Sequence, residues 1–319
     1  MNPIDAILWP IKWVVEAIVV AFHTMFAAVG LDAAAGLTWV LSIVGLVLVV
    51  RAALIPIFVK QIKSQRRMME VAPQIKKIQD KYKGKKDQFS REAMSRETME
   101  LYKRTGTNPL SSCLPLLIQM PIFFALFSVL NNAQNSTKGV GLLDTPLAVQ
   151  FGEASLFDVA PLHQSFSTPG VSITVQIIAV VMVILMTASQ FITQLQIMSK
   201  NQSPEMKASP TYKQQKMLLY LLPLVFAFSG FAFPLGVMFY WLTSNFWTMV
   251  QQFLVIRNMP TPGSEAAQAR EIRIARRNQR RGIAIVEMDS PNAIEEIKKT
   301  QRPQPVNKNR AKKQGGNKK

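Results

Sequence analysis

Long apolar runs separated by charged segments dominate the chain. Five of these runs are each near the ~20 residues that a helix needs to cross the hydrocarbon core of a bilayer. They cover residues 37–58, 112–130, 172–197, 217–233 and 236–256. The last two are separated only by Pro234 and Leu235, so they are predicted to form a tight helical hairpin. The pattern predicts an all-α polytopic membrane protein with five transmembrane helices.

The N-terminal region, residues 1–36, carries a further apolar segment with a polar stripe. Four ionisable residues share one face of a helix over residues 4–29, because they are spaced by 7, 4 and 7 positions: Asp5, Lys12, Glu16 and His23. A transmembrane helix has no use for such a stripe, whereas a helix lying in the membrane interface does. Trp9 and Trp13 suit that depth. We therefore expect an outer interfacial helix; the alternatives are a sixth span and an uncleaved signal anchor.

A strongly basic segment, residues 59–111, separates the first two spans. Apolar residues repeat there at intervals of 3, 4, 3 and 4, a pattern typical of a coiled-coil seam: Met68, Val71, Ile75, Ile78 and Tyr82. Pro73 is expected to bend or restart this helix, and Gly84 interrupts it. A second helix is predicted at about 90–104, with Ser90 as its N-cap. The segment predicts a helical hairpin, which either touches lipid headgroups as a solvated arm or contacts a substrate or partner.

Charge predicts how the chain is oriented in the membrane. The formal net charge is +18 although 49% of the residues are hydrophobic. Basic residues gather in 59–111, 198–216 and 257–319, whereas loop 131–171 has only Lys138 against three acidic residues. Cytoplasmic loops of membrane proteins carry the excess of Lys and Arg. We therefore expect the N-terminus outside the cell, the C-terminus in the cytoplasm, and loop 131–171 outside.

Arg51 lies within the first apolar run, in the stretch VGLVLVVRAALIPI. A charge at mid-bilayer costs roughly 2.5–3.5 kcal/mol on insertion scales. Arg51 would avoid this cost by snorkelling to cytoplasmic headgroups, by packing against a neighbouring polar side chain, or by lining a water-filled groove open to the cytoplasm and to lipid. Other spans contain polar residues that suit such a groove, since these usually face the bundle interior or a wet cavity: Gln119, Gln190, Gln194, Thr243, Ser244 and Asn245.

Several motifs, in this order, resemble the YidC-type membrane protein insertases and in particular their short, Gram-positive-like members. They are VVRAALIPI, MMEVAPQIKKIQDKYK, METMELYKRTGTNP, LSSCLPLLIQMPIFFALF and PLGVMFYWLTSNFWTMVQQFLV, and the resemblance covers about residues 37–257. It implies five spans around a polar groove with Arg51 as its positive centre, and Tyr240 and Trp241 on the wall along which substrate segments slide. It also implies that nascent membrane proteins are inserted into the bacterial cytoplasmic membrane without nucleotide hydrolysis, alone or with the Sec translocon.

The C-terminal segment, residues 257–319, contains sixteen basic and six acidic residues. Residues 270–281 form a candidate basic helix, and the remainder has the composition of a disordered tail. Six arginines are candidate contacts to the ribosome or to anionic lipid: Arg270, Arg273, Arg276, Arg277, Arg280 and Arg281. The resemblance favours ribosome contact, helped by the hairpin, with lipid contact as a companion. The remaining alternative is a tail that only fixes topology.

Other function classes find less support in the sequence. A small-anion transporter could use one arginine in a polar groove, but there is no inverted repeat and no acidic–basic pair within the spans. An intramembrane enzyme would need a base beside a nucleophile, or a carboxylate pair, and no Asp or Glu lies in any span. A passive assembly scaffold overlaps with the family's role. With one Cys and two His, we expect no disulfide, metal site or cofactor, and no small-molecule substrate.

Overall fold

The structure, a computed structural model, describes residues 3–85, 87–107, 114–135, 137–207 and 210–281. Internal contacts divide the chain into two units, residues 1–268 and residues 269–319. The second unit contributes the greater part of the last helix. The segment 282–319, where a disordered tail is predicted, and residues 108–113, where the second span is predicted to begin, lie outside the described residues.

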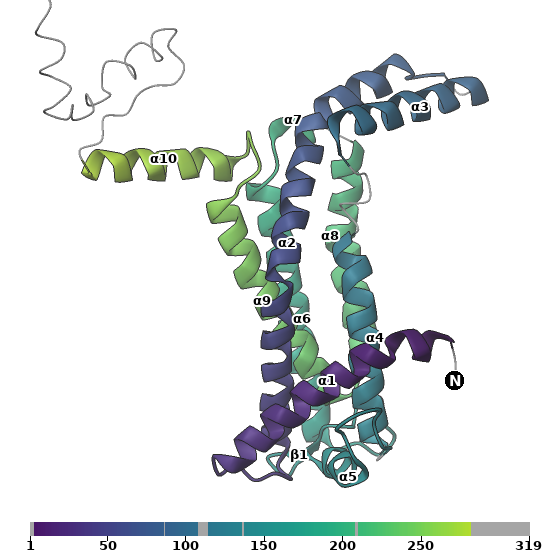
Figure 1. Cartoon of the computed structure of the whole chain (residues 1–319), viewed down its shortest axis with the longest axis vertical. Coiled ribbons are helices and arrows are strands. Elements are labelled where there is room, and N and C mark those ends of the chain that lie inside the picture. Colours follow the sequence, from purple (N-terminus) through teal and green to yellow (C-terminus); the bar gives the residue numbers. More distant parts are fainter. Residues whose placement is uncertain (1–2, 86, 108–113, 136, 208–209, 282–319) are drawn as a thin grey trace, which may run out of the picture. The chain divides into compact units, whose positions relative to one another are not determined.

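Helices make up most of the described chain, which confirms the all-α prediction (Figure 1). They are α1 (Pro3–Ala28), α2 (Gly36–Lys81), α3 (Gln88–Thr105), α4 (Leu114–Gln134), α5 (Thr145–Glu153), α6 (Ile173–Lys200), α7 (Pro204–Lys207), α8 (Pro210–Gly230), α9 (Leu235–Asn258) and α10 (Glu265–Arg280). Strands β1 (Ser155–Leu156) and β2 (Ala160–Pro161) pair antiparallel.

Three of the described helices contain stretches long and apolar enough to cross a membrane, namely Ala6–Ala28, Gly36–Met68 and Ile173–Lys200. The second and third correspond to predicted spans. Shorter apolar stretches, Leu117–Ala133 and Leu219–Gly230, fall in two further predicted spans. The chain is therefore consistent with an all-α membrane protein, and the number of five spans stays a prediction.

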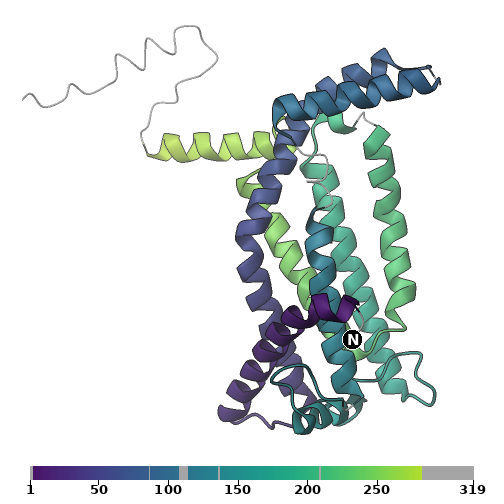
Figure 2. The same cartoon turned by 45° about the vertical axis from the view of Figure 1, so that its right-hand side comes forward.

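Helix α6 packs along both α8 and α9 (Figures 1 and 2). Its buried side chains recur at helical spacing, so that one side of the helix faces its neighbours: Val175, Ala179, Met182, Val183, Met186, Ser189 and Thr193. Close approach to α8 depends on Gly230, because a Cβ there would lie 2.9 Å from Cγ2 of Val183. The resulting core holds α9 in place, and α9 carries much of the predicted groove.

Helix α2 does not end where the first span was predicted to end. It continues without interruption from Gly36 to Lys81, so the predicted boundary at residues 58–59 is a change of composition within one helix. Pro56 and Pro73 both lie inside it. Each proline removes one backbone donor, so bending at Pro73 is compatible with the observed continuity, whereas a restart there is not observed.

The basic hairpin, residues 59–107 of the described chain, folds with its predicted seam turned inward. Val71 of α2 and Leu101 of α3 are buried, and Gly84 has a φ of 86°, a conformation that favours glycine and ends the first arm. The predicted N-cap was wrong. Asp87 caps α3, accepting a hydrogen bond from the backbone N–H of Ser90 at 2.8 Å, so the helix begins at Gln88.

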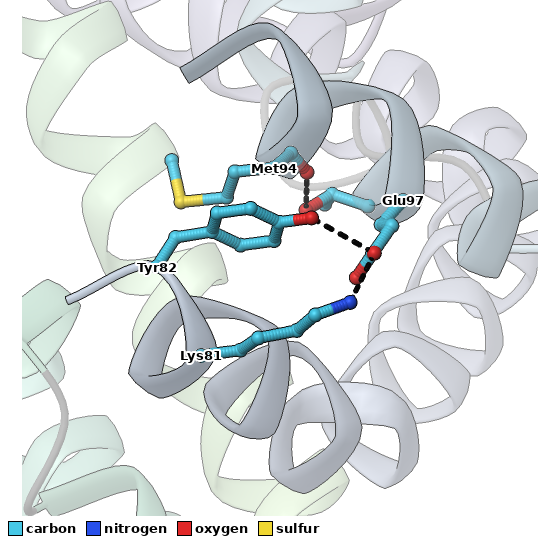
Figure 3. A network of polar contacts seen from close by, with 5 residues as sticks. Lys81, Tyr82, Met94 and Glu97 are labelled. Carbon is cyan, nitrogen blue, oxygen red and sulfur yellow. Dashed lines mark hydrogen bonds and ion pairs between the residues drawn. The ribbon is translucent and has the colours of Figure 1, made fainter. Parts of the chain in front are cut away.

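A polar clasp joins the two arms of the hairpin near its tip (Figure 3). Glu97 of α3 accepts hydrogen bonds from the ammonium group of Lys81 and, at 2.9 Å, from the hydroxyl of Tyr82. The hydrogen bond between the two side chains lowers the pKa of Glu97 and raises the pKa of Lys81. The side chain of Met94 lies beside the Tyr82 ring, where the apolar seam ends.

Loop 131–171 contains more structure than the sequence predicted. Helix α5, capped by Asp144, and the β1–β2 pair surround buried Phe151 and Leu162. The loop also completes α9, because the first backbone N–H groups of that helix donate to loop carbonyl oxygens. Leu235 donates to Gln164 and Gly236 to Leu162, both at 3.0 Å. These bonds satisfy donors that a helix N-terminus otherwise leaves unpaired.

The polar stripe of α1 faces protein. Lys12, Glu16 and His23 are buried, and Glu16 is only 1% exposed, whereas an interfacial helix was expected to turn this stripe to water. The outward side chains include Trp9 and Trp13. Both views show α1 running obliquely across α2 and α4 (Figures 1 and 2).

A glycine-containing turn in loop 131–171 explains the burial of Glu16. Its carboxylate accepts backbone hydrogen bonds from Val140 at 2.8 Å and Gly141 at 2.6 Å. A Cβ on Gly139 would lie 2.5 Å from the carboxylate, so only glycine permits this approach. His23 is held in a similar way, since its Nε2 donates to the carbonyl oxygen of Ala33 at 2.8 Å and its ring stacks on Trp39.

Candidate functional site

Arg51 connects α2 to α9. Its guanidinium group donates a hydrogen bond to the hydroxyl of Ser244, and its central carbon lies 6.0 Å from the centre of the Phe58 ring. An aromatic face at this distance attracts a cation. Among the described residues, no carboxylate forms an ion pair with Arg51. The half-buried cation is thus held by a neutral hydroxyl and a ring, and its charge is not neutralised.

A second hydrogen bond lies next to the first. Gln119 of α4 donates through Nε2 to the hydroxyl of Tyr240 at 3.1 Å, and Tyr240 is buried. Tyr240 and Ser244 are four residues apart in α9, so they share one face of that helix. Arg51, Gln119, Tyr240 and Ser244 together form what we call the polar centre.

Apolar side chains from three helices surround the polar centre. They are Val15 of α1, Leu46, Val47 and Val50 of α2, and Ile122 and Leu126 of α4. The space that they leave for water is about 10 Å³, roughly enough for a single molecule. The geometry is that of a narrow polar site, and a water-filled groove stays a prediction.

The other predicted groove residues lie elsewhere. Trp241 is one residue after Tyr240 and therefore faces about 100° away, where it packs against Phe123 and Phe233 with ring centres 5.7 and 5.5 Å apart. Asn245 donates to the carbonyl oxygen of Met186, at 3.4 Å, and so joins α9 to α6.

Gln190 and Gln194 lie half-buried on α6. Neither forms a hydrogen bond with the polar centre in the part of the chain that the structure describes. The sequence grouped Ser244 with its polar neighbours but did not identify it as the partner of Arg51. The signal was the spacing of four between Tyr240 and Ser244, which places both on one helix face.

The six predicted arginine contacts belong to the second unit. All lie in or directly after α10, and all are exposed: Arg270, Arg273, Arg276, Arg277, Arg280 and Arg281. The helix begins at Glu265, five residues earlier than predicted, because Ser264 caps it by accepting from the N–H of Ala267 at 3.3 Å. Ile272 and Ile274, its large apolar residues, are also exposed.

Comparison with known proteins gives this geometry a context. The model of the family described as 60Kd inner membrane protein matches residues 30–262, which contain the whole polar centre. The chain belongs to this family. A curated protein of Tropheryma whipplei (strain Twist), named membrane protein insertase YidC, is 46% identical over 314 residues, 96% of each chain.

Relatives with the same name occur in other bacteria. The protein of Bifidobacterium longum is 37% identical over 320 residues, covering 96% of this chain and 95% of its own. That of Streptomyces avermitilis is 46% identical over 268 residues, which are 82% of this chain but 60% of the longer relative. The resemblance drawn from the motifs is thereby confirmed.

Proposed function

We propose that the chain is a membrane protein insertase, which moves the short polar tail of a nascent membrane protein across the bilayer while the adjoining hydrophobic segment enters lipid. The observation that carries this proposal is Arg51, a cation in an apolar stretch of α2 with which no carboxylate of the described residues forms an ion pair, in a family whose curated members are named insertases. No nucleotide is needed, because burial of a hydrophobic segment releases about 25 cal/mol per Å² of apolar surface.

The narrow polar centre suggests how a substrate enters. An acidic tail supplies a carboxylate, which is a stronger partner for Arg51 than the neutral hydroxyl of Ser244, because it carries the opposite charge and has two oxygens that can pair with the guanidinium group in a bidentate way. Exchange of one partner for the other separates α2 from α9 and admits water. The membrane potential adds about 2.3 kcal/mol per charge per 100 mV in favour of outward movement of an acidic tail.

The remaining assignments belong to the same proposal. The chain lies in the bacterial cytoplasmic membrane with the basic hairpin and α10 in the cytoplasm and loop 131–171 outside, because basic residues gather at one end of the helices. The oblique course of α1 supports a position near the outer interface. The proposed partners are nascent membrane proteins, the Sec translocon, the ribosome through the hairpin and the six arginines, and anionic lipids.

Reconstitution tests the proposal directly. Purified protein in liposomes is given a single-span substrate with a short acidic outer tail, and insertion is scored by protection from added protease. We expect Arg51→Ala to lower insertion about tenfold, because a hydrogen bond to a charged group contributes about 1.5–3 kcal/mol, and Arg51→Lys to retain most activity. Thr243→Ala is the matched control, since the Thr243 hydroxyl bonds only within its own helix, to Phe239 at 2.8 Å.

The same liposomes distinguish the alternatives. Equal insertion by wild type and Arg51→Ala would retain the insertase and remove Arg51 as its driver. No insertion by folded wild-type protein would contradict the proposal and favour a scaffold. Anion flux without any substrate peptide would favour the small-anion transporter.

A further inference from the structure

A second cleft lies between α2 and α9, one to three turns beyond Arg51 toward the basic ends of both helices. It has a volume of about 310 Å³. One wall is formed by α2, through Ile55, Phe58, Val59 and Ile62. The other is formed by α9, through Trp247, Val250, Gln251, Leu254, Val255, Asn258 and Met259. Gln251 accepts a hydrogen bond from the indole of Trp247 at 2.9 Å, so the lining is almost entirely apolar. No residue of the polar centre takes part.

The cleft is open at the side of the helices. Ile55, Val250 and Leu254, which line it, are exposed. The residues from Ile55 to Ile62 rise about 10 Å along the helix axis. In the proposed orientation Ile55 and Phe58 lie at the cytoplasmic end of the first predicted span, and Ile62 lies just beyond it, within the apolar stretch Gly36–Met68. The occupant must therefore come from lipid.

Cationic side chains follow the cleft at its basic end. Lys63 comes directly after Ile62 and is exposed. Arg66 lies one turn beyond Ile62 on the same face of α2, and its Nε is buried without a hydrogen-bond partner. A buried donor that lacks an acceptor is unfavourable. The end of the cleft thus offers positive charge and an unused donor where headgroups are expected.

We propose that the α2–α9 cleft holds one acyl chain of an anionic phospholipid, whose phosphate is bound by Arg66 and Lys63. The cleft leaves about 310 Å³, against about 10 Å³ at the polar centre, and this space suits a flexible hydrocarbon chain. A helix about 10–12 Å in diameter does not fit in it. The site depends on the proposed orientation but not on insertase activity, and it is separate from the contacts proposed for α10.

Photo-crosslinking in membranes tests the site. The full chain is placed in phosphatidylcholine vesicles that contain a small fraction of phosphatidylglycerol with a photoreactive acyl chain, and adducts are mapped by mass spectrometry. We expect adducts on residues 55–62 and 247–259 to exceed, several-fold, those formed by equally labelled phosphatidylcholine. Ile177 and Ile184, exposed apolar positions on α6, should show no such preference. Equal labelling by both lipids would overturn the proposal, because it would show only bulk lipid.

Two variants separate the acyl chain from the headgroup. Val250→Trp fills the cleft and should remove most phosphatidylglycerol adducts from Phe58 and Leu254, whereas Ile184→Trp should not. Arg66→Gln should remove the preference for phosphatidylglycerol, whereas Arg91→Gln on α3 should not. If Val250→Trp does not fold, Leu254→Trp replaces it. Undiminished adducts in the filled variants, or crosslinks from the cleft to a second copy of the chain, would contradict the proposal.

Insertion measured in parallel separates this proposal from the proposed function. If labelling shows no preference for phosphatidylglycerol while the protein still inserts its substrate, only the lipid site is overturned. Loss of insertion in Arg51→Ala, with the adduct pattern unchanged, would support both proposals independently.

Discussion

Arg51 and Glu16 are both ionisable residues among apolar helices, and the fold treats them differently. Glu16 accepts two backbone hydrogen bonds in a space that excludes water. Arg51 has one neutral hydroxyl and an aromatic face. The carboxylate is therefore committed to its partners, while the guanidinium group retains donors for another acceptor. This difference is why we assign a structural role to Glu16 and a functional one to Arg51.

Ser244→Ala removes the hydroxyl that accepts from Arg51. We expect the free energy of unfolding in detergent to fall by about 1–3 kcal/mol, because a partly buried charged donor loses its acceptor. Thr243→Ala should change it by less than about 0.5 kcal/mol, as is usual for substitutions that remove no such partner. Chemical denaturation of both variants measures these changes. Equal losses in the free energy of unfolding would mean that the Arg51–Ser244 bond contributes nothing specific.

Glu16→Gln tests the buried carboxylate. The amide keeps one acceptor oxygen but points an NH₂ group at a backbone donor, so we expect a loss of about 2–3 kcal/mol in the free energy of unfolding. Glu153→Gln, at an exposed position in α5, is the matched control. Thermal unfolding of both variants gives the comparison. A stable Glu16→Gln protein would show that loop 131–171 does not depend on this contact.

At the scale of elements, the hairpin arms are joined by a modest apolar seam and by the exposed clasp of Lys81, Tyr82 and Glu97. Because the pKa of Glu97 is lowered, its contribution is present above the ordinary glutamate pKa and is lost as the pH falls through the lowered value. Because the pKa of Lys81 is raised, its contribution is present below the ordinary lysine pKa and is lost as the pH rises through the raised value.

The hairpin should therefore open on acidification. We expect amide protection factors in α3, which correct for the intrinsic pH dependence of exchange, to fall as the pH drops below the usual range of a glutamate. In Glu97→Gln they should be low already at neutral pH and should change little with acidification. Glu100→Gln, on the exposed side of the same helix, should behave as wild type. A wild-type hairpin whose protection is independent of pH would contradict this role of the clasp.

Periodicity predicted which faces are buried, but not what covers them. The seam around Val71 and the apolar runs were visible because their spacing repeats locally. The contact of Glu16 with loop 131–171 joins residues 124 positions apart, and the Arg51–Ser244 bond joins residues 193 apart. A stripe of ionisable residues has the same sequence pattern whether water or a glycine-containing turn lies against it. The sequence therefore selected Arg51 and Tyr240, whose roles stay predictions, but it did not show that the polar stripe of α1 is buried.

For the whole molecule, the family match covers residues 30–262 and so leaves out both α1 and α10 entirely. These two helices lie toward the two ends of the chain. Labelling from each side of the membrane tests on which side each of them lies. We expect single cysteines at Lys63 and Gln279, in a Cys113→Ser background, to react with impermeant reagents only from the cytoplasmic side. A cysteine at Asp158 should react only from outside, because the basic segments are retained in the cytoplasm.

An N-terminal tag extends the same experiment to α1. If α1 lies in the outer interface, the tag is accessible from the side of Asp158. A tag accessible from the cytoplasm would show instead that α1 spans the membrane. Reaction of the Lys63 and Asp158 positions from one and the same side would contradict the proposed orientation altogether.

The continuity of α2 has a mechanical consequence. A helix of 46 residues is a rod of about 69 Å, with Arg51 about a third of the way along it and Tyr82 just past its end. Force applied to the hairpin tip is carried to Arg51 along the backbone of one continuous helix. The rod yields first at Pro56 and Pro73, where a backbone hydrogen bond is missing. A ribosome or substrate that pulls on the hairpin thus applies force to the Arg51–Ser244 contact from a distance. The two prolines determine how much of that force reaches the contact.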